Sequence, residues 1–129
     1  LVNAARSYLY TTASPPLLAA ALLASLAEIE AGARRRARLQ GHIARLKAAL
    51  AACPHGRLLP SDTAIQPLIV GENAAASALS GRLAERGLLV PAIRTPTVPA
   101  NTARLRITLS AAHSADDVAQ LVEALHALA

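Results

Sequence analysis

The chain has 129 residues and a mass of 13.3 kDa, which is the length of about one domain. Hydrophobic residues make up 53% and charged residues 16%, a balance that excludes intrinsic disorder as the default. Aromatic residues are only 2%, Tyr8 and Tyr10, so base stacking on nucleic acid is nearly excluded. The formal net charge of +5 suits an anionic ligand, and we expect no nucleic-acid partner.

The cellular context follows from cysteine usage and from the longest apolar run. Cys53 is the single cysteine, which excludes an internal disulfide and suits a reducing compartment. Residues 17–27 are the most apolar run, and they are too few for the about twenty residues that a membrane-spanning helix needs. We therefore expect a cytoplasmic protein with no membrane partner. The sequence contains no methionine and begins at Leu1, which predicts a processed chain or a piece of a longer one.

The N-terminal part of the chain predicts helix. Ser14 is expected to be the N-cap, with Pro15 in the first turn, and leucine and isoleucine recur at helical spacing to about residue 52. Gly32 and Gly41 are weak points, each costing about 1 kcal/mol relative to alanine. Because one helix of this length exceeds the diameter of so small a domain, we expect it to lie across a second domain or subunit.

The remainder predicts alternating strands and helices. The expected elements are a strand at 65–71, a helix from Glu72 or Asn73 to Arg86, a strand at 88–93, a strand at 104–109 and a last helix after Ser114. Gly87 is expected to end the first of these helices, and Asp116 and Asp117 suit the first turn of the last one. The prediction is an α/β (α+β) fold in which helices pack on one face of a small, mostly antiparallel sheet.

Three arginines around a proline-rich loop are the strongest candidate for a binding site. Arg94 ends one predicted strand, the loop TPTVPANT follows, and Arg104 and Arg106 share one face of the next strand. Guanidinium groups that converge beside a stiff loop suit the bidentate binding of a carboxylate or a phosphate. The alternative is a solvated strand face that forms ordinary ion pairs with acidic side chains.

The hydroxyl groups of Tyr10, Thr11 and Thr12 precede a predicted helix. Hydroxyls next to a helix N-terminus can bind phosphate, but the same residues can equally serve as helix caps. The arginines at 34–36, with Arg38, predict a solvated helix surface, and contact with an acidic partner is the alternative.

The sequence contains no clear motif for a metal site or for a catalytic nucleophile. The four histidines are scattered without ligand spacing, and neither a glycine-rich phosphate loop nor a nucleophile elbow occurs. His113 lies at a strand-to-helix corner, where a structural imidazole is favoured over a catalytic one. Cys53 is expected to be inert. We therefore predict no catalytic residue and no metal ligand in this chain.

The block VPAIRTPTVPANTARLRITLSAAHSADD resembles the C-terminal signature of the α-oxoamine synthases. These are pyridoxal-phosphate enzymes of aminotransferase fold type I, and the resemblance runs from about Tyr10 to the C-terminus. IQPLIVGEN and AIRTPTVP resemble most the member that joins a pimeloyl thioester (of CoA or of acyl carrier protein) to L-alanine, with loss of CO2, in biotin synthesis. YTTASPP resembles the segment that opens the long inter-domain helix.

The resemblance implies a homodimer whose active sites lie at the subunit interface. Thr11 and Thr12 match positions that reach the cofactor phosphate of the neighbouring subunit. Arg106 matches the arginine that holds the amino-acid carboxylate, and Arg94 matches a second arginine that can swing onto it. Thr97 matches a substrate contact in the loop. Residues 1–52 would then be the end of the large domain with the connecting helix, and residues 53–129 the C-terminal small domain.

One feature of the family is not found in this sequence. The lysine that attaches the cofactor belongs to an upstream motif, and Lys47 stands in an ordinary amphipathic helix instead. The chain alone is therefore expected to be inactive. Two alternatives stay open: another α-oxoamine synthase, which condenses glycine or serine with a different acyl-CoA, and a non-catalytic domain that binds acidic partners.

Overall fold

The computed structural model describes residues 4, 5 and 12–128. Contacts along the chain divide it into two compact units, Leu1–Arg34 and Arg35–Ala129. The predicted division into residues 1–52 and 53–129 stays a prediction.

The first unit contains helix α2 (Pro16–Glu30), whose side chains are all exposed. The prediction that Ser14 is its N-cap is wrong, because Pro15 takes that position and no side chain caps the helix. The single helix predicted to about residue 52 is also wrong: α2 ends before Ala31 and Gly32, and α3 (Ala33–Ala49) begins after them. In the described part of the chain, no single helix is long and apolar enough to cross a membrane, and only α2 and α3 as a broken pair reach that length and composition.

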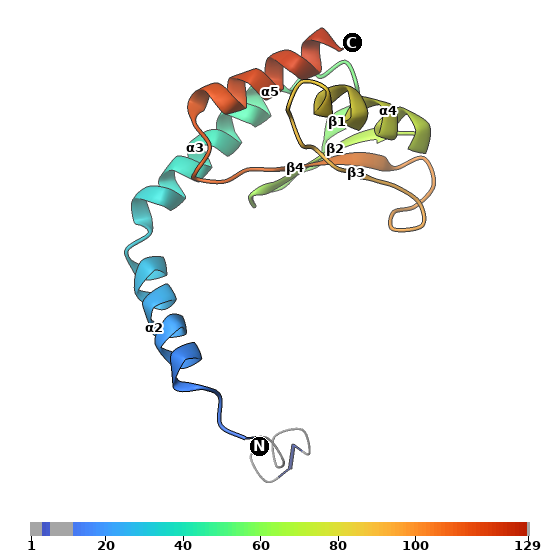
Figure 1. Cartoon of the computed structure of the whole chain (residues 1–129). Helices are drawn as coiled ribbons and strands as arrows, with labels where there is room; N and C mark the ends of the chain where they lie inside the picture. Colours follow the sequence, from blue (N-terminus) through green and yellow to red (C-terminus); the bar gives the residue numbers. More distant parts are fainter. Residues whose placement is uncertain (1–3, 6–11, 129) are drawn as a thin grey trace. The chain divides into compact units, whose positions relative to one another are not determined.

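A four-stranded antiparallel sheet forms the centre of the second unit (Figure 1). The strand order is β1-β2-β4-β3, with β1 at Arg57–Leu58, β2 at Ile65–Gly71, β3 at Ala92–Ile93 and β4 at Ala103–Thr108. The predicted fold class, an α/β fold with a small antiparallel sheet covered by helices, is confirmed.

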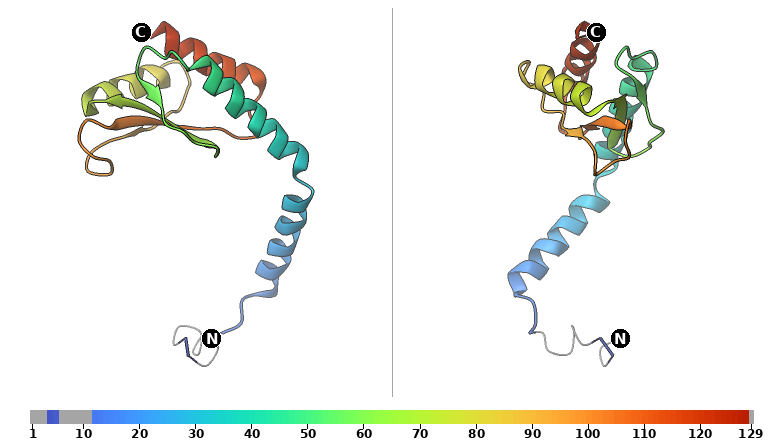
Figure 2. Two further views of the ribbon diagram at one scale, coloured as in Figure 1. Left: turned by 180° about the vertical axis from the view of Figure 1, so that it is seen from behind. Right: turned by 90° about the vertical axis from the view of Figure 1, so that its right-hand side faces the viewer.

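Helices α3, α4 (Asn73–Ala84) and α5 (Ala115–Ala127) cover one face of this sheet, and both views in Figure 2 show them on the same side. Leu105 and Ile107 of β4 point toward the helices and are almost completely buried, whereas Arg106 and Thr108 between and beyond them are exposed. The strict alternation predicted for this strand is therefore confirmed. We call the side of the sheet that carries Arg106 the open face.

The core lies between the covered face and the three helices. Its fully buried side chains come from every layer, and they include Leu46, Leu50, Leu68, Leu83, Leu105 and Leu125. Burying a leucine side chain contributes roughly 1.5–3 kcal/mol, so this layer holds helices and sheet together without any aromatic residue.

The strand predicted at residues 88–93 is shorter than expected, because only Ala92 and Ile93 pair with β4. The N–H of Leu88 instead donates to the carbonyl of Leu83 at 3.0 Å and closes the end of α4. Gly87 adopts a φ of +77°, which allows this reversal of the chain as predicted. Helix α4 itself ends at Ala84, two residues before the predicted end.

Ser114 caps α5 as predicted. The Asp117 N–H donates to the Ser114 hydroxyl at 3.0 Å, and the Asp117 carboxylate accepts from the Ser114 N–H at 2.7 Å, which completes a capping box. These hydrogen bonds to Ser114 hold the pKa of Asp117 below its ordinary value of 3.8. Since the folded pKa is depressed, the cap stabilises the fold at neutral pH and loses that contribution as the pH falls through the folded pKa.

Two glycines give a matched test of the fold. Gly56 has a φ of +148°, and a Cβ there would overlap the carbonyl oxygen of Ile69, whereas a Cβ on Gly41 in α3 would meet nothing within 4 Å. We expect Gly56→Ala to lower the free energy of unfolding by about 2 kcal/mol or more. Gly41→Ala should raise it by about 0.5–1 kcal/mol. Urea denaturation of both variants measures this, and equal effects would contradict the described geometry.

Candidate functional site

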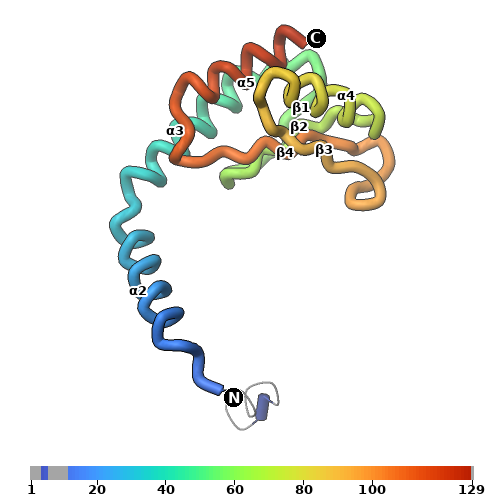
Figure 3. Tube along the Cα trace, in the orientation of Figure 1, coloured from blue at the N-terminus to red at the C-terminus, as the bar shows by residue number. Residues whose placement is uncertain are grey.

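The loop between β3 and β4 is built from tight local hydrogen bonds and extends beyond the end of the sheet (orange in Figure 3). The backbone N–H groups of Thr97 and Val98 donate to the Arg94 carbonyl at 2.9 and 3.3 Å. The Thr102 hydroxyl donates to the Pro99 carbonyl at 2.7 Å. Thr97 itself is exposed. The loop therefore holds the Thr97 side chain at a defined, solvent-accessible position.

Side chains of helix α4 hold the start of this loop. The Asn73 side-chain oxygen accepts hydrogen bonds from the N–H and the hydroxyl of Thr95, at 3.3 and 3.4 Å. One turn further along α4, the Ser77 hydroxyl accepts a hydrogen bond from Nη1 of Arg94 at 3.1 Å. A pocket of about 320 Å³ opens beside the first of these contacts, between the start of α4 and the loop.

Arg104 and Arg106 share the open face, as the alternation of β4 predicts. The Nε and Nη2 atoms of Arg104 donate to the carbonyl and the hydroxyl of Thr102, at 3.1 and 3.2 Å, so its guanidinium stabilises the loop. Arg106 lies opposite Pro67 of β2 and is exposed. Among the described residues, its guanidinium has no hydrogen-bond partner, which leaves all its donors available to an anion.

Arg94 points the other way. In the register of the sheet Ile93 lies opposite Arg104, so these two residues share the open face. Arg94 is one position further along, and its guanidinium reaches α4 on the covered face. Of the two or three guanidinium groups expected to converge, Arg104 and Arg106 share the open face, whereas Arg94 is held by Ser77.

The predicted cofactor contacts lie in the first unit. Thr12 is exposed and lies shortly before α2, and Thr11 lies outside the described residues. Their role toward a cofactor phosphate stays a prediction.

His113 has a structural role, as the sequence favoured. Its Nδ1 accepts a hydrogen bond from the Ser110 N–H at 3.1 Å. Its carbonyl oxygen lies 2.8 Å from the donating Nη2 of Arg38 and 3.0 Å from Nε2 of the buried His42, which ties the start of α5 to α3. In the described part of the chain, no group of histidine, cysteine and acidic side chains could hold a metal ion.

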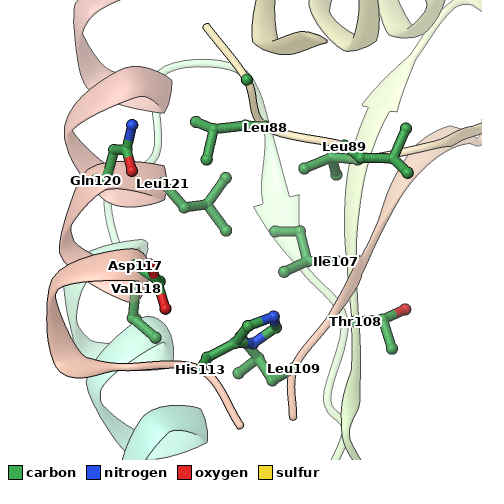
Figure 4. A pocket seen from close by; sticks show the side chains of 12 residues that line it. Leu88, Leu89, Ile107, Thr108, Leu109, His113, Asp117, Val118, Gln120 and Leu121 are labelled. Atoms are coloured by element: carbon green, nitrogen blue, oxygen red, sulfur yellow. The ribbon is translucent and has the colours of Figure 1, made fainter.

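A hollow of about 360 Å³ lies between α5 and the segment that leads into β3 (Figure 4). Leucine side chains of both elements line it, with His113 and Asp117 at one end and Gln120 further along α5. Arg94, Thr97 and Arg106, the predicted site residues of the second unit, do not line this hollow.

Sequence reasoning missed Asn73 and Ser77 as residues of the site. They are four positions apart and therefore lie on one face of α4. The local sequence gives no signal that this face meets the loop, because that contact joins segments about twenty residues apart.

Comparison with known proteins identifies the family. Residues 1–125 match the class I and II aminotransferases. The 8-amino-7-oxononanoate synthase of Thiobacillus denitrificans (strain ATCC 25259 / T1) is 66% identical over 129 residues, which are 100% of this chain and 33% of that protein. The chain thus spans about one third of the length of the curated relatives that it matches.

Solved structures resemble the fold over nearly the whole chain. The 8-amino-7-oxononanoate synthase of Francisella tularensis matches with a TM-score of 0.82 and 28% identity, over 98% of this chain and 37% of that one. A structure of SPT (serine palmitoyltransferase) with PLP matches with a TM-score of 0.85 and 26% identity, over 98% and 32%. The chain belongs to the class I and II aminotransferase family.

Proposed function

We propose that this chain is the C-terminal part of a pyridoxal-phosphate-dependent acyltransferase. The reaction condenses a pimeloyl thioester, of CoA or of acyl carrier protein, with L-alanine to give 8-amino-7-oxononanoate, CO2 and the free thiol, in biotin biosynthesis. Identity of 66% to a protein of that name over all 129 residues supports the assignment. The single structural observation that supports it best is the exposed guanidinium of Arg106 on the open face of β4, which has no hydrogen-bond partner among the described residues.

Arg106 binds the carboxylate of the amino acid in this proposal. A guanidinium presents two parallel N–H donors that match a carboxylate. Of Arg94, Arg104 and Arg106, only Arg106 has no hydrogen-bond partner among the described residues. A carboxylate fixed in this way orients the Cα substituents of the amino acid, which is a positioning effect on the reaction. Thr97 contacts the substrate from the loop that Asn73 and Arg104 hold in place.

The described residues do not by themselves fit pyridoxal phosphate. Lys47 is the only lysine, and its Nζ forms an ion pair with Asp62 at 3.0 Å, away from the loop and the open face. We propose that the attachment lysine lies outside this chain and that Thr11 and Thr12 reach the cofactor phosphate of a neighbouring subunit in a homodimer.

This chain and the remainder of the enzyme have different roles in the proposal, because the free guanidinium donors of Arg106 lie in this chain and the attachment lysine does not. This chain binds and orients the amino acid, and the remainder of the enzyme supplies the cofactor and its chemistry. The chain alone is then inactive. The domain assignment, with residues 1–52 connecting and residues 53–129 forming the small domain, belongs to the same proposal, as does a cytoplasmic location.

A sibling activity is the second candidate, because SPT is among the similar solved structures. The two activities differ in the amino acid and in the acyl donor. The full-length enzyme should be assayed with L-alanine, glycine and L-serine, each against pimeloyl-CoA, pimeloyl acyl carrier protein and palmitoyl-CoA. We expect turnover with L-alanine and a pimeloyl thioester to exceed the other pairs. A preference for serine with palmitoyl-CoA would establish the sibling reaction instead.

Removing the Arg106 guanidinium tests the carboxylate role. Arg106→Ala in the full-length enzyme should raise the KM for L-alanine by about tenfold to several hundredfold, because a charge-assisted bidentate contact is lost. The KM for the acyl donor should change far less. Arg82→Ala, which removes an exposed arginine of α4, is the matched control. An unchanged KM for L-alanine in the Arg106 variant would exclude this role, and steady-state kinetics decides it.

A further inference from the structure

We propose that the hollow between α5 and the segment before β3 binds the pantetheine arm of the acyl donor. This arm is a flexible chain with two amide groups, and thioesters of CoA and of acyl carrier protein share it. The inference rests on the proposed function and adds a binding site for its second substrate. Its basis is an unpaired stretch of the β4 edge that lies among apolar side chains, two residues from Arg106.

The pairing of β4 with the segment before it ends at Pro91. The Arg106 N–H donates to the Pro91 carbonyl at 2.9 Å, and a proline has no N–H with which to continue the ladder. Backbone groups of every second residue face the same side of a strand, so the N–H and C=O of Thr108 also face this side. Within the described structure, no backbone hydrogen bond joins them to Leu89, the residue that would lie opposite. Thr108 therefore presents one unpaired donor and one unpaired acceptor to the hollow.

Apolar side chains surround this edge. Leu88, Ile107 and Leu121 point toward one another across the hollow of about 360 Å³, as Figure 4 shows. Leu89 also lines it and is 92% exposed, more than any other large hydrophobic side chain among the described residues. Sites for small ligands have volumes of roughly 300–1,000 Å³, with mostly apolar linings and a few polar groups. The hollow thus suits a narrow ligand of mainly apolar atoms that carries amide groups.

The pantetheine arm has this composition. Its β-alanine unit carries an N–H at one end and a C=O at the other, as a residue in a strand does, with one additional carbon between them. It can therefore pair with the N–H and C=O of Thr108 in the way that an added strand pairs with a sheet edge. The methylene and methyl groups of the arm then contact the leucine side chains and lose their exposure to water.

The position of Thr108 connects the hollow with the candidate carboxylate site. Thr108 and Arg106 are two residues apart on β4, which is about 7 Å, and both side chains lie on the open face. Condensation requires the thioester carbon to approach the amino acid whose carboxylate Arg106 binds. A peptide segment of a longer polypeptide could also pair with this edge, but the proximity to Arg106 favours the arm of the acyl donor.

The backbone contact is tested in the full-length, cofactor-loaded enzyme. Thr108→Pro removes the edge N–H, which lies on the side of β4 away from β2, and Thr108→Val keeps that N–H and is the matched reference. We expect the Kd for CoA, measured by isothermal titration calorimetry, to be about two- to tenfold higher in the proline variant than in the valine variant. The KM values for pimeloyl-CoA and pimeloyl acyl carrier protein should differ by a similar factor. Equal Kd values in the two variants would overturn the proposal.

The apolar contact is tested at Leu89, whose exposed side chain can be changed without disturbing the core. Leu89→Asn should raise the Kd for CoA about three- to thirtyfold relative to Leu89→Met, with the KM for L-alanine changed far less. Thermal unfolding separates the two possible occupants. A lower Tm in the asparagine variant, with the same Kd as in the methionine variant, would assign the hollow to a peptide segment and overturn the proposal.

The two sources of the arm, and the failure of the proposed function, are distinguished by the wild type. An effect of the variants on pimeloyl-CoA but not on pimeloyl acyl carrier protein, where the wild type uses both, would place the contact on the nucleotide of CoA and overturn the proposal. If the wild type prefers serine with palmitoyl-CoA, the proposed function fails. The same variants then test the hollow with palmitoyl-CoA, because that donor carries the same arm.

Discussion

The alternation of side chains along β4 is the constraint on which the rest of the structure depends. Leu105 and Ile107 are buried against the helices, so Arg104 and Arg106 have to lie on the open face. A shift of register by one residue would bury both guanidinium groups and expose the leucine and isoleucine. The hydrophobic core and the candidate carboxylate site are therefore specified by the same six-residue strand, and neither can be rearranged without the other.

The loop before β4 adds the exposed Thr97 to the candidate site that β4 carries. Arg104 uses its donors on Thr102 at one end of the loop, and Asn73 holds Thr95 at the other end. Because its two ends are fixed by different elements, the loop presents the exposed Thr97 at a defined position beyond the end of the sheet. Arg106, two positions further along the same face, has no hydrogen-bond partner among the described residues. Two arginines of one strand face thus differ: Arg104 stabilises the loop, and Arg106 is available to the ligand that we propose.

Sequence patterns predicted those elements whose signal is local. The alternation of β4 and the Ser114 cap depend on neighbouring residues, and both are confirmed. The direction of Arg94 depends on the pairing of β3, which has only two residues. The apolar run at residues 88–90 led to the prediction of a longer strand. Gly32, a predicted weak point, lies at the break between α2 and α3. The helical spacing of the apolar residues did not predict that the helix would end there. Contacts of Asn73 and Ser77 with the loop are non-local, and a single sequence carries no pattern for them.

The central claim is that the open face of β4 binds the amino-acid carboxylate in the complete enzyme. A crystal structure of the full-length, cofactor-loaded enzyme with L-alanine tests it most directly. We expect both carboxylate oxygens to lie within about 2.7–3.2 Å of the Arg106 guanidinium nitrogens. An L-alanine carboxylate bound by other residues, with Arg106 still in solvent, would contradict it.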